Sequence, residues 1–316
     1  MKRTLILLLA LLALSGCAGS GNGGFPPAKA ARPAENPEIT FTDDLGRELS
    51  LSPPQRVAAM IGSFAGIWAV AGGEDTLVAA ANDAWTSFDL ELEGAVNLGT
   101  TSSPNLELLL AAEPDLILAS CNTASNLELL ETFETAGLTA AYFDVESIDD
   151  YLRMLNVCAE LTGCPENYET YGTAVKEQAE AAAARQDGSH PTVLYVRASG
   201  SSCKVKNSSG SVLGEMLADL GCSNVADRDG SLLETLSLEA VIAADPDYIF
   251  AVLQGADASK AQAVLEDTLL SHPAWSGLRA VREGRFYTLD NKLYNLKPNA
   301  RWGEAYEKLA DILYPE

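Results

Sequence analysis

The side chains best suited to holding a ligand in this sequence are a few aromatic and cationic residues. Phe64, Trp85 and Tyr294 could stack on a flat conjugated ligand. Arg197 and Lys204 could form charge-assisted hydrogen bonds with ligand carboxylates or phenolates. These two cations stand out because 44 Asp and Glu residues against 21 Lys and Arg residues leave a net charge of −23. The residue types indicate binding of a ligand rather than catalysis.

The sequence lacks the motifs of common enzyme classes. Gly-x-Ser-x-Gly, HExxH and Walker patterns do not occur. The competing hypothesis is a surface glycoside hydrolase that uses two carboxylates, but aromatic residues make up only 7% of the chain. Rows of aromatic residues typical of an adhesion module are not evident either. We therefore expect no catalytic activity, no cofactor and no resident metal site, and the acidic surplus excludes nucleic-acid binding.

The N-terminus indicates export and a lipid anchor. Lys2 and Arg3 precede an apolar run that is about half of the ~20 residues a membrane-spanning helix needs. The run ends in Leu-Ser-Gly-Cys17, which is similar to the lipobox of bacterial lipoproteins. We expect residues 1–16 to be a signal peptide, Cys17 to carry lipid, and the Gly-, Pro- and Ala-rich residues 17–38 to form a flexible tether. The predicted location is extracytoplasmic, on the cell membrane.

Five further cysteines remain if Cys17 is lipidated. Cys158 and Cys164 lie six residues apart around Gly163, which is expected to end a helix. A chain reversal at this point could bring the two sulfurs within disulfide range. Cys203 with Cys222 is a weaker alternative, and five unpaired thiols are a third.

An internal repeat is the most informative pattern for the fold. The segment 105–118 (NLELLLAAEPDLIL) returns as 237–250 (SLEAVIAADPDYIF), 132 residues further on. In each copy Asn105 or Ser237 is expected to cap a short helix, a proline ends it, and an apolar run follows as a buried parallel strand. The Glu107 and Glu239 carboxylates would also favour the positive helix N-termini. The repeat predicts two similar α/β lobes.

Further strand–helix alternation supports these lobes and gives their bounds. Strands are expected at 56–61, 77–81 and 139–143 in the first lobe, and at 192–197 and 285–289 in the second. The predicted first lobe spans 39–146, the second spans 191–316, and connecting helices over 147–190 open at a Ser147-x-x-Asp150 capping box. Ligands of two-lobed α/β proteins lie at the loops after strands. This rule selects the aromatic and cationic residues named at the outset, together with three further residues. The full set is Ser63, Phe64, Trp85, Cys121, Asn122, Arg197, Lys204 and Tyr294.

At this point the sequence resembles a known family. The residues that carry the resemblance are the hairpin 39–51, the duplicated segment, and the C-terminal HPAW, GRFY and PNARW motifs. They are similar to the substrate-binding lipoproteins of ABC importers, in particular the iron-siderophore, heme and cobalamin group. The similarity covers about residue 39 to the end. It implies two Rossmann-like lobes with parallel sheets, joined by a long spine helix.

The resemblance also implies partners and roles. Glu107 and Glu239 match the family's glutamates that dock into a permease dimer, and the protein would act as a monomer. The ligand would be a metal chelate or tetrapyrrole: a ferric siderophore, a corrinoid or heme. Neither His190 nor His272 is expected at a position where it could bind heme iron. The sequence therefore favours a ligand whose metal needs no bond from a protein side chain, such as a ferric siderophore or a corrinoid. Cys121 is retained as an alternative axial ligand to a heme or cobalt centre.

Overall fold

The computed structural model describes residues 38–234, 236–255 and 257–315. The predicted signal peptide, Cys17 and almost all of the tether lie outside these residues. No helix in the described ranges combines the length and the apolarity needed to cross a membrane.

The described chain opens with the predicted hairpin. Strands β1 (Ile39–Thr42) and β2 (Glu48–Leu51) pair antiparallel, with Ile39 opposite Leu51. The turn between them forms because the Asp43 carboxylate accepts hydrogen bonds from the amides of Leu45 (3.1 Å) and Arg47 (2.9 Å). Gly46 adopts a positive φ of 77°, which glycine allows without strain.

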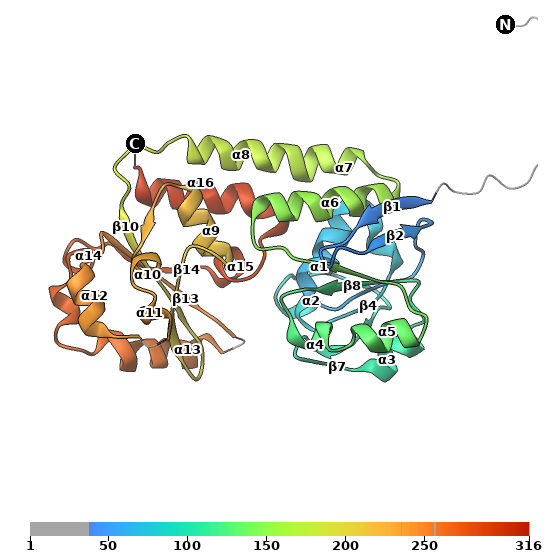
Figure 1. Cartoon of the computed structure of the whole chain (residues 1–316), viewed down its shortest axis with the longest axis horizontal. Helices are drawn as coiled ribbons and strands as arrows, with labels where there is room; N and C mark the ends of the chain where they lie inside the picture. The colour runs from blue at the N-terminus through green and yellow to red at the C-terminus, as the bar shows by residue number, and fades with distance from the viewer. Residues whose placement is uncertain (1–37, 235, 256, 316) are drawn as a thin grey trace, which may run out of the picture. The chain divides into compact units, whose positions relative to one another are not determined.

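The first sheet is fully parallel and has the strand order β5-β4-β3-β8-β9. Its strands β4 and β8 are labelled in Figure 1. Its strands are β3 (Val57–Ala59), β4 (Leu77–Ala80), β5 (Val96–Asn97), β8 (Leu116–Ser120) and β9 (Ala140–Phe143). Between them lie α1 (Gly62–Trp68), η1 (Ala69–Gly73), η2 (Glu74–Thr76), α2 (Asp83–Thr86), β6 (Gly99–Thr100), β7 (Ser103–Pro104), α3 (Leu106–Ala111), α4 (Ala124–Leu127) and α5 (Leu130–Thr135). Alternate strand residues face opposite sides, so Ile117 lies in one buried cluster with Phe133, while Leu118 lies in another with Phe64.

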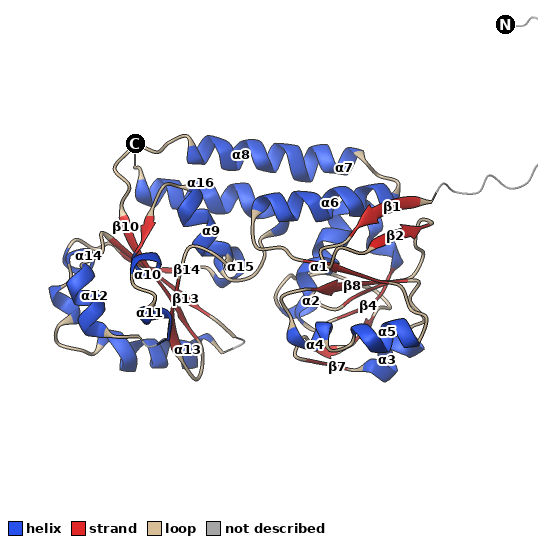
Figure 2. Cartoon of the chain, viewed as in Figure 1, coloured by secondary structure: helices blue, strands red, loops and turns tan. Residues whose placement is uncertain are grey.

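Helices connect the two sheets (Figure 2). Helix α6 (Ile148–Thr162) opens at the predicted capping box, in which the Ser147 hydroxyl accepts from the Asp150 amide at 3.2 Å, and it ends at Gly163 with φ 74°. Segments α7 (Glu166–Tyr168), η3 (Glu169–Thr173) and α8 (Ala174–Ala183) then follow without a break. Helix α8 lies along the C-terminal helix α16 (Trp302–Leu313), and the Arg185–Asp311 ion pair (2.6 Å) joins their ends.

The second sheet has the strand order β11-β10-β13-β14, and the short strand β12 also pairs with β10. Its strands are β10 (Thr192–Ala198), β11 (Cys203–Lys206), β12 (Ser223–Asn224), β13 (Tyr248–Leu253) and β14 (Phe286–Leu289). The accompanying helices are α9 (Val212–Asp219), α10 (Val225–Arg228), α11 (Ser231–Glu234), α12 (Leu238–Ala244), α13 (Ala258–Leu265), η4 (Glu266–Leu270), η5 (Trp275–Gly277), α14 (Arg279–Arg282), α15 (Asn291–Tyr294) and η6 (Asn299–Arg301). Every pairing is parallel except β10–β11, where the chain turns back after Ala198. The mixed α/β class with parallel sheets, predicted from the sequence, is confirmed.

The structure corrects the predicted disulfide. All five cysteines of the described chain are unbonded thiols. Cys158 points into the core from α6 and is fully buried, whereas Cys164 follows the end of that helix and its sulfur lies near Gly72. Gly163 does reverse the chain, but Cys158 and Cys164 are not bonded to each other.

Candidate functional site

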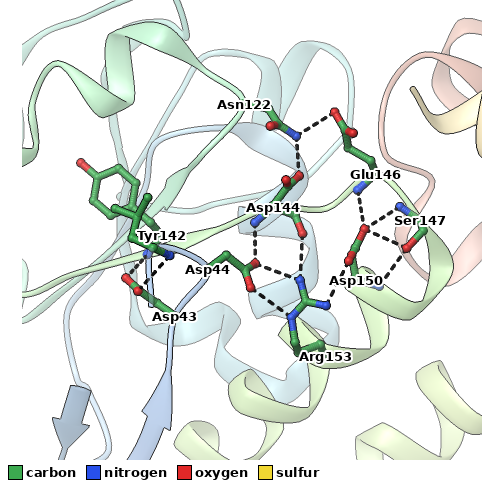
Figure 3. A network of polar contacts seen from close by, with 10 residues as sticks. Asp43, Asp44, Asn122, Tyr142, Asp144, Glu146, Ser147, Asp150 and Arg153 are labelled. Carbon is green, nitrogen blue, oxygen red and sulfur yellow. Dashed lines mark hydrogen bonds and ion pairs between the residues drawn. The ribbon is translucent and has the colours of Figure 1, made fainter. Parts of the chain in front are cut away.

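Polar side chains follow the carboxyl ends of two neighbouring strands of the first sheet. Asn122 comes after β8, and Asp144 and Glu146 come after β9. The Asn122 amide nitrogen donates to the Asp144 carboxylate at 2.5 Å and to the Glu146 carboxylate at 2.9 Å (Figure 3). Burial, and then the charge of Asp144, raise the pKa of Glu146 above its ordinary value. We call Asp144 and Glu146 the acidic pair.

An ion-paired network holds the acidic pair in place (Figure 3). The Arg153 guanidinium on α6 donates to both oxygens of Asp44 (3.1 and 3.0 Å) and to Asp150 (3.0 Å). Asp44 in turn accepts from the Asp144 amide at 2.6 Å, and Asp150 accepts from the Glu146 amide at 3.2 Å. The β1–β2 turn and the α6 capping box therefore fix the backbone on which the acidic pair stands.

Cations lie on one face of the antiparallel β10–β11 ladder. Arg197 is directly opposite Lys204, and Tyr195 is opposite Lys206, so these four residues share one face. Arg197 also donates to the Asn295 side chain at 3.3 Å. Burial, followed by the nearby charge of Arg197, lowers the pKa of Lys206. Lys297 is half-buried, and the charge of Glu146 acts on it as it does on Lys206. We call Arg197, Lys204, Lys206 and Lys297 the basic cluster.

The acidic pair and the basic cluster are electrostatically coupled. Burial lowers the pKa of Lys297, and the Glu146 carboxylate is the largest opposing influence. A Cβ atom placed on Gly210, just before α9, would lie 3.8 Å from a Glu146 carboxylate oxygen. Loops after strands of the first sheet thus meet residues of the second sheet in one place, where opposite charges face each other.

A cavity of about 200 Å³ adjoins this place. Its lining includes Phe88 and Leu90 from the segment after α2, and Lys297 and Arg301 from the C-terminal part of the chain. An ion pair between Lys292 and Asp89 (2.6 Å) spans its edge. The cavity is smaller than the roughly 300–1,000 Å³ of typical small-molecule pockets. Within the described residues, no group of three or more His, Cys, Asp or Glu side chains is arranged to hold a metal ion.

Comparison with known proteins decides the family. The periplasmic binding protein family model matches residues 57–293. The chain belongs to the periplasmic binding protein family. The Fe(3+)-citrate-binding protein YfmC of Bacillus subtilis is 27% identical, over 90% of this chain and 87% of its own length.

Solved structures agree on the fold of this periplasmic binding protein. The apo heme-binding protein RhuT of Roseiflexus has a TM-score of 0.67 at 24% identity, covering 82% of this chain and 98% of its own. The iron-uptake binding protein PiuA of Streptococcus pneumoniae has a TM-score of 0.69 at 18% identity, covering 89% of this chain and 99% of its own. The family resemblance found in the sequence is confirmed.

Three residues predicted to contact the ligand of this periplasmic binding protein lie in the interior instead. Phe64 is 0% exposed and meets the Phe143 ring edge to face, with centroids 6.3 Å apart. Tyr294 is 2% exposed, and its hydroxyl donates to the Ala305 carbonyl at 3.1 Å. Ser63 is buried as well, because α1 begins at Gly62 and its first turn packs inward. In this conformation the three side chains serve packing, and none of them is open to a ligand.

The other predicted ligand residues remain accessible and keep their status as candidates. Asn122 joins the acidic pair, Arg197 and Lys204 belong to the basic cluster, and Trp85 is half-buried on α2. Cys121 differs from them because burial, with the nearby charge of Asp44, raises the pKa of its thiol to about 11. An axial role for Cys121 stays a prediction, because a bound metal would itself deprotonate the thiol.

Sequence reasoning missed three residues of the site: Asp144, Glu146 and Lys206. The acidic pair follows a strand that the sequence did predict, so the rule that ligands lie after strands could have selected it. Lys204 and Lys206 are spaced i, i+2, which places both on one face of a strand. The short strand β11 was not predicted, and this signal was therefore not used.

The predicted docking glutamates stand on matching helices. Asn105 caps α3 by accepting from the Leu108 amide at 3.0 Å, and Ser237 caps α12 by accepting from the Ala240 amide at 3.3 Å. Glu107 and Glu239 are both exposed. Neither carboxylate forms a salt bridge with another residue in the described parts of the chain.

Proposed function

We propose that this chain is the extracytoplasmic solute-binding lipoprotein of an ABC importer, which captures a metal chelate and hands it to a permease. The observation that carries the proposal is the position of Glu146, after the carboxyl end of β9, where its charge acts on both Lys206 and Lys297 and its carboxylate reaches the Gly210 segment before α9. This is where α/β proteins of two lobes bind their ligands. Binding and release require no bond-making chemistry, and the protein acts without enzymatic activity.

The charge of the site favours an anionic chelate over heme or a corrinoid. Four cations gather on one side of the site in a chain of net charge −23. With Phe64 and Tyr294 in the interior, Trp85 is the remaining aromatic side chain predicted to stack on a flat ring. The name of the Fe(3+)-citrate-binding relative points to the same class. Ferric complexes of carboxylate-rich chelators are therefore the proposed ligands.

The anchor and the permease contact complete the proposal. Cys17, at the predicted lipobox, would carry the lipid that holds the protein at the membrane, with residues 17–38 as a tether. Glu107 and Glu239 would pair with cations of the permease, because both carboxylates are exposed and unpaired within the described chain. The protein would act as a monomer.

A ligand screen with matched variants tests this function. In a thermal-shift and calorimetric screen, ferric citrate should stabilise the protein, whereas heme and cobalamin should have no effect. Lys206→Gln should weaken ferric citrate binding about tenfold, because it removes one partly desolvated charge. Lys308→Gln, which removes an exposed charge of α16 that pairs with Glu304 at 2.8 Å, is the control and should bind like the wild type.

Three results would count against the proposal. Stabilisation by heme or cobalamin alone would overturn the anionic class. Equal losses of affinity in the Lys206 and Lys308 variants would overturn the placement of the site. Hydrolysis of chromogenic glycosides would revive the enzyme hypothesis. The anchor is tested separately, since Cys17→Ala should release the protein from the membrane fraction.

A further inference from the structure

Helix α9 begins beside the candidate site. The segment 207–211 leads from strand β11, which carries Lys204 and Lys206, into the first turn of this helix. A Cβ atom placed on Gly210 would lie 3.8 Å from a carboxylate oxygen of Glu146, so the segment also meets the loop after β9. Four consecutive residues at the start of the helix are buried: Ser211, Val212, Leu213 and Gly214. The N-terminus of α9 is therefore a buried helix end next to the basic cluster.

The amides of this helix end lack acceptors. The first amide groups of any helix have no partner within the helix, and a buried helix end normally finds one elsewhere. Among the described residues, no oxygen accepts a hydrogen bond from the amides of Val212, Leu213 or Gly214. The Gly210 amide, which lies outside the helix, does donate to the Glu215 carboxylate at 3.2 Å. Three donors thus remain unused at the positive end of the helix dipole.

The Ser211 hydroxyl adds a second, independent unused group. Ser211 is only 7% exposed, and its Oγ atom has no hydrogen-bond partner in the described chain. It stands at the N-cap position of α9 but makes no capping hydrogen bond. A Cβ atom placed on Gly214 would lie 2.7 Å from this oxygen, so the hydroxyl lies over the first turn. Because a buried hydroxyl without a partner costs free energy, an acceptor bound at this position would be favoured.

The surroundings of the helix end select an anionic group. Lys206 precedes the segment, and both Lys206 and Lys297 lie within reach of the charge of Glu146. Amide donors at a helix N-terminus bind phosphate or carboxylate oxygens. Ser209 and Gly210 are exposed, and Gly210 has no side chain, so the helix end can be approached from solvent. A carboxylate that enters here would meet donors in front and cations beside it.

We propose that the N-terminus of α9 is a carboxylate subsite, in which one carboxylate of the bound chelate accepts hydrogen bonds from the Ser211 hydroxyl and the first-turn amides. This inference rests on the proposed function and names the part of the site that recognises the chelator. The lysines attract the chelate, while the hydroxyl and amides fix the direction from which its carboxylate binds. The Glu146 carboxylate stands at the edge of the subsite and opposes the incoming charge.

The test titrates ferric citrate into variants of the full chain by calorimetry and records the thermal midpoint of each variant without ligand. Ser211→Ala removes the hydroxyl. Ser211→Asp places a carboxylate in the subsite itself, and Ser211→Asn has the same size without the charge. Ser237→Ala is the matched control, because Ser237 also stands at an N-cap but its hydroxyl already accepts from the Ala240 amide at 3.3 Å.

The two alanine variants should behave in opposite ways. Ser211→Ala should keep or raise the thermal midpoint, because it removes an unpartnered hydroxyl, and it should weaken ferric citrate binding about tenfold. Ser237→Ala should lower the midpoint by about 2 °C and bind ferric citrate like the wild type. Ser211→Asp should weaken binding by at least about 100-fold, well beyond Ser211→Asn, because its charge occupies the subsite.

Four results would overturn the subsite. Normal binding by Ser211→Ala, together with weak binding by Lys206→Gln, would remove the subsite and leave the proposed function standing. Equal losses in the Ser211→Asp and Ser211→Asn variants would show that size and not charge matters. A midpoint lowered as much by Ser211→Ala as by Ser237→Ala would assign the hydroxyl to the fold. If the wild type binds no ferric citrate, the proposed ligand class fails, and this inference fails with it.

Discussion

At the scale of single residues, the site is a balance of opposite charges. The basic cluster would repel itself without a counter-charge, and the Glu146 carboxylate supplies one by favouring the protonated form of Lys297. The same carboxylate opposes an incoming anion. Burial and Asp144 already make ionisation of Glu146 unfavourable, which is shown by its raised pKa. Glu146 is therefore the residue through which pH should alter both stability and ligand affinity.

Glu146→Gln should tighten ferric citrate binding about threefold at pH 7, because it removes one negative charge next to the ligand. It should also stabilise the protein at pH 7. Since the folded-state pKa lies above the ordinary value of 4.5, wild-type stability is lost as pH rises through the folded pKa. Both differences should vanish as the pH falls well below 4.5, where the carboxyl group is neutral in the folded and the unfolded state alike. Calorimetry and urea unfolding at several pH values provide the measurements.

Glu307→Gln, at an exposed position in the middle of α16, is the control for this prediction and should change neither quantity. A difference between Glu146→Gln and the wild type that persists undiminished at low pH would show that the effect is not electrostatic.

At the scale of elements, the sequence predicted what local chemistry decides. The caps at Asn105, Ser147 and Ser237 and the left-handed Gly163 were all predicted and are all present. Each depends on residues within four positions of one another. Strand β11 was not predicted, because Cys203–Lys206 owes its conformation to pairing with β10. The inward direction of Phe64 and Tyr294 depends on distant packing partners, which spacing along the chain cannot reveal.

The capping box of α6 should matter to stability because it also carries the acidic pair. Ser147→Ala should lower the free energy of unfolding by about 1 kcal/mol. Thr123→Ala is the matched control, since Thr123 stands at the N-cap of α4 but its side chain makes no capping hydrogen bond. It should cost well under about 0.5 kcal/mol. Urea unfolding at pH 7 measures both, and equal losses would mean that the capping box contributes nothing of its own.

At the scale of the whole molecule, the length and the repeat predicted two α/β lobes but not their common core. One cluster of buried side chains includes Leu118 of the first sheet and Phe250 of the second, together with Leu155 of α6 and Leu309 of α16. The shared interior arises because helices of the connecting and C-terminal segments pack against both sheets. Sequence periodicity identifies which face of a helix is apolar, but it does not say which sheet that face will meet.

The shared core leads to a prediction about cooperativity. If helices α6, α8 and α16 bury side chains against both sheets, these helices cannot separate from one sheet without also exposing apolar side chains of the other. The most protected amides of β8 and β13 should therefore exchange through one global opening, with equal free energies and equal dependence on urea. Native-state hydrogen exchange measured on peptides from the two strands makes the comparison directly. Two separate free energies, with β8 and β13 opening at different urea concentrations, would show that the lobes unfold independently. In that case the cluster would be an interface between two domains rather than one core.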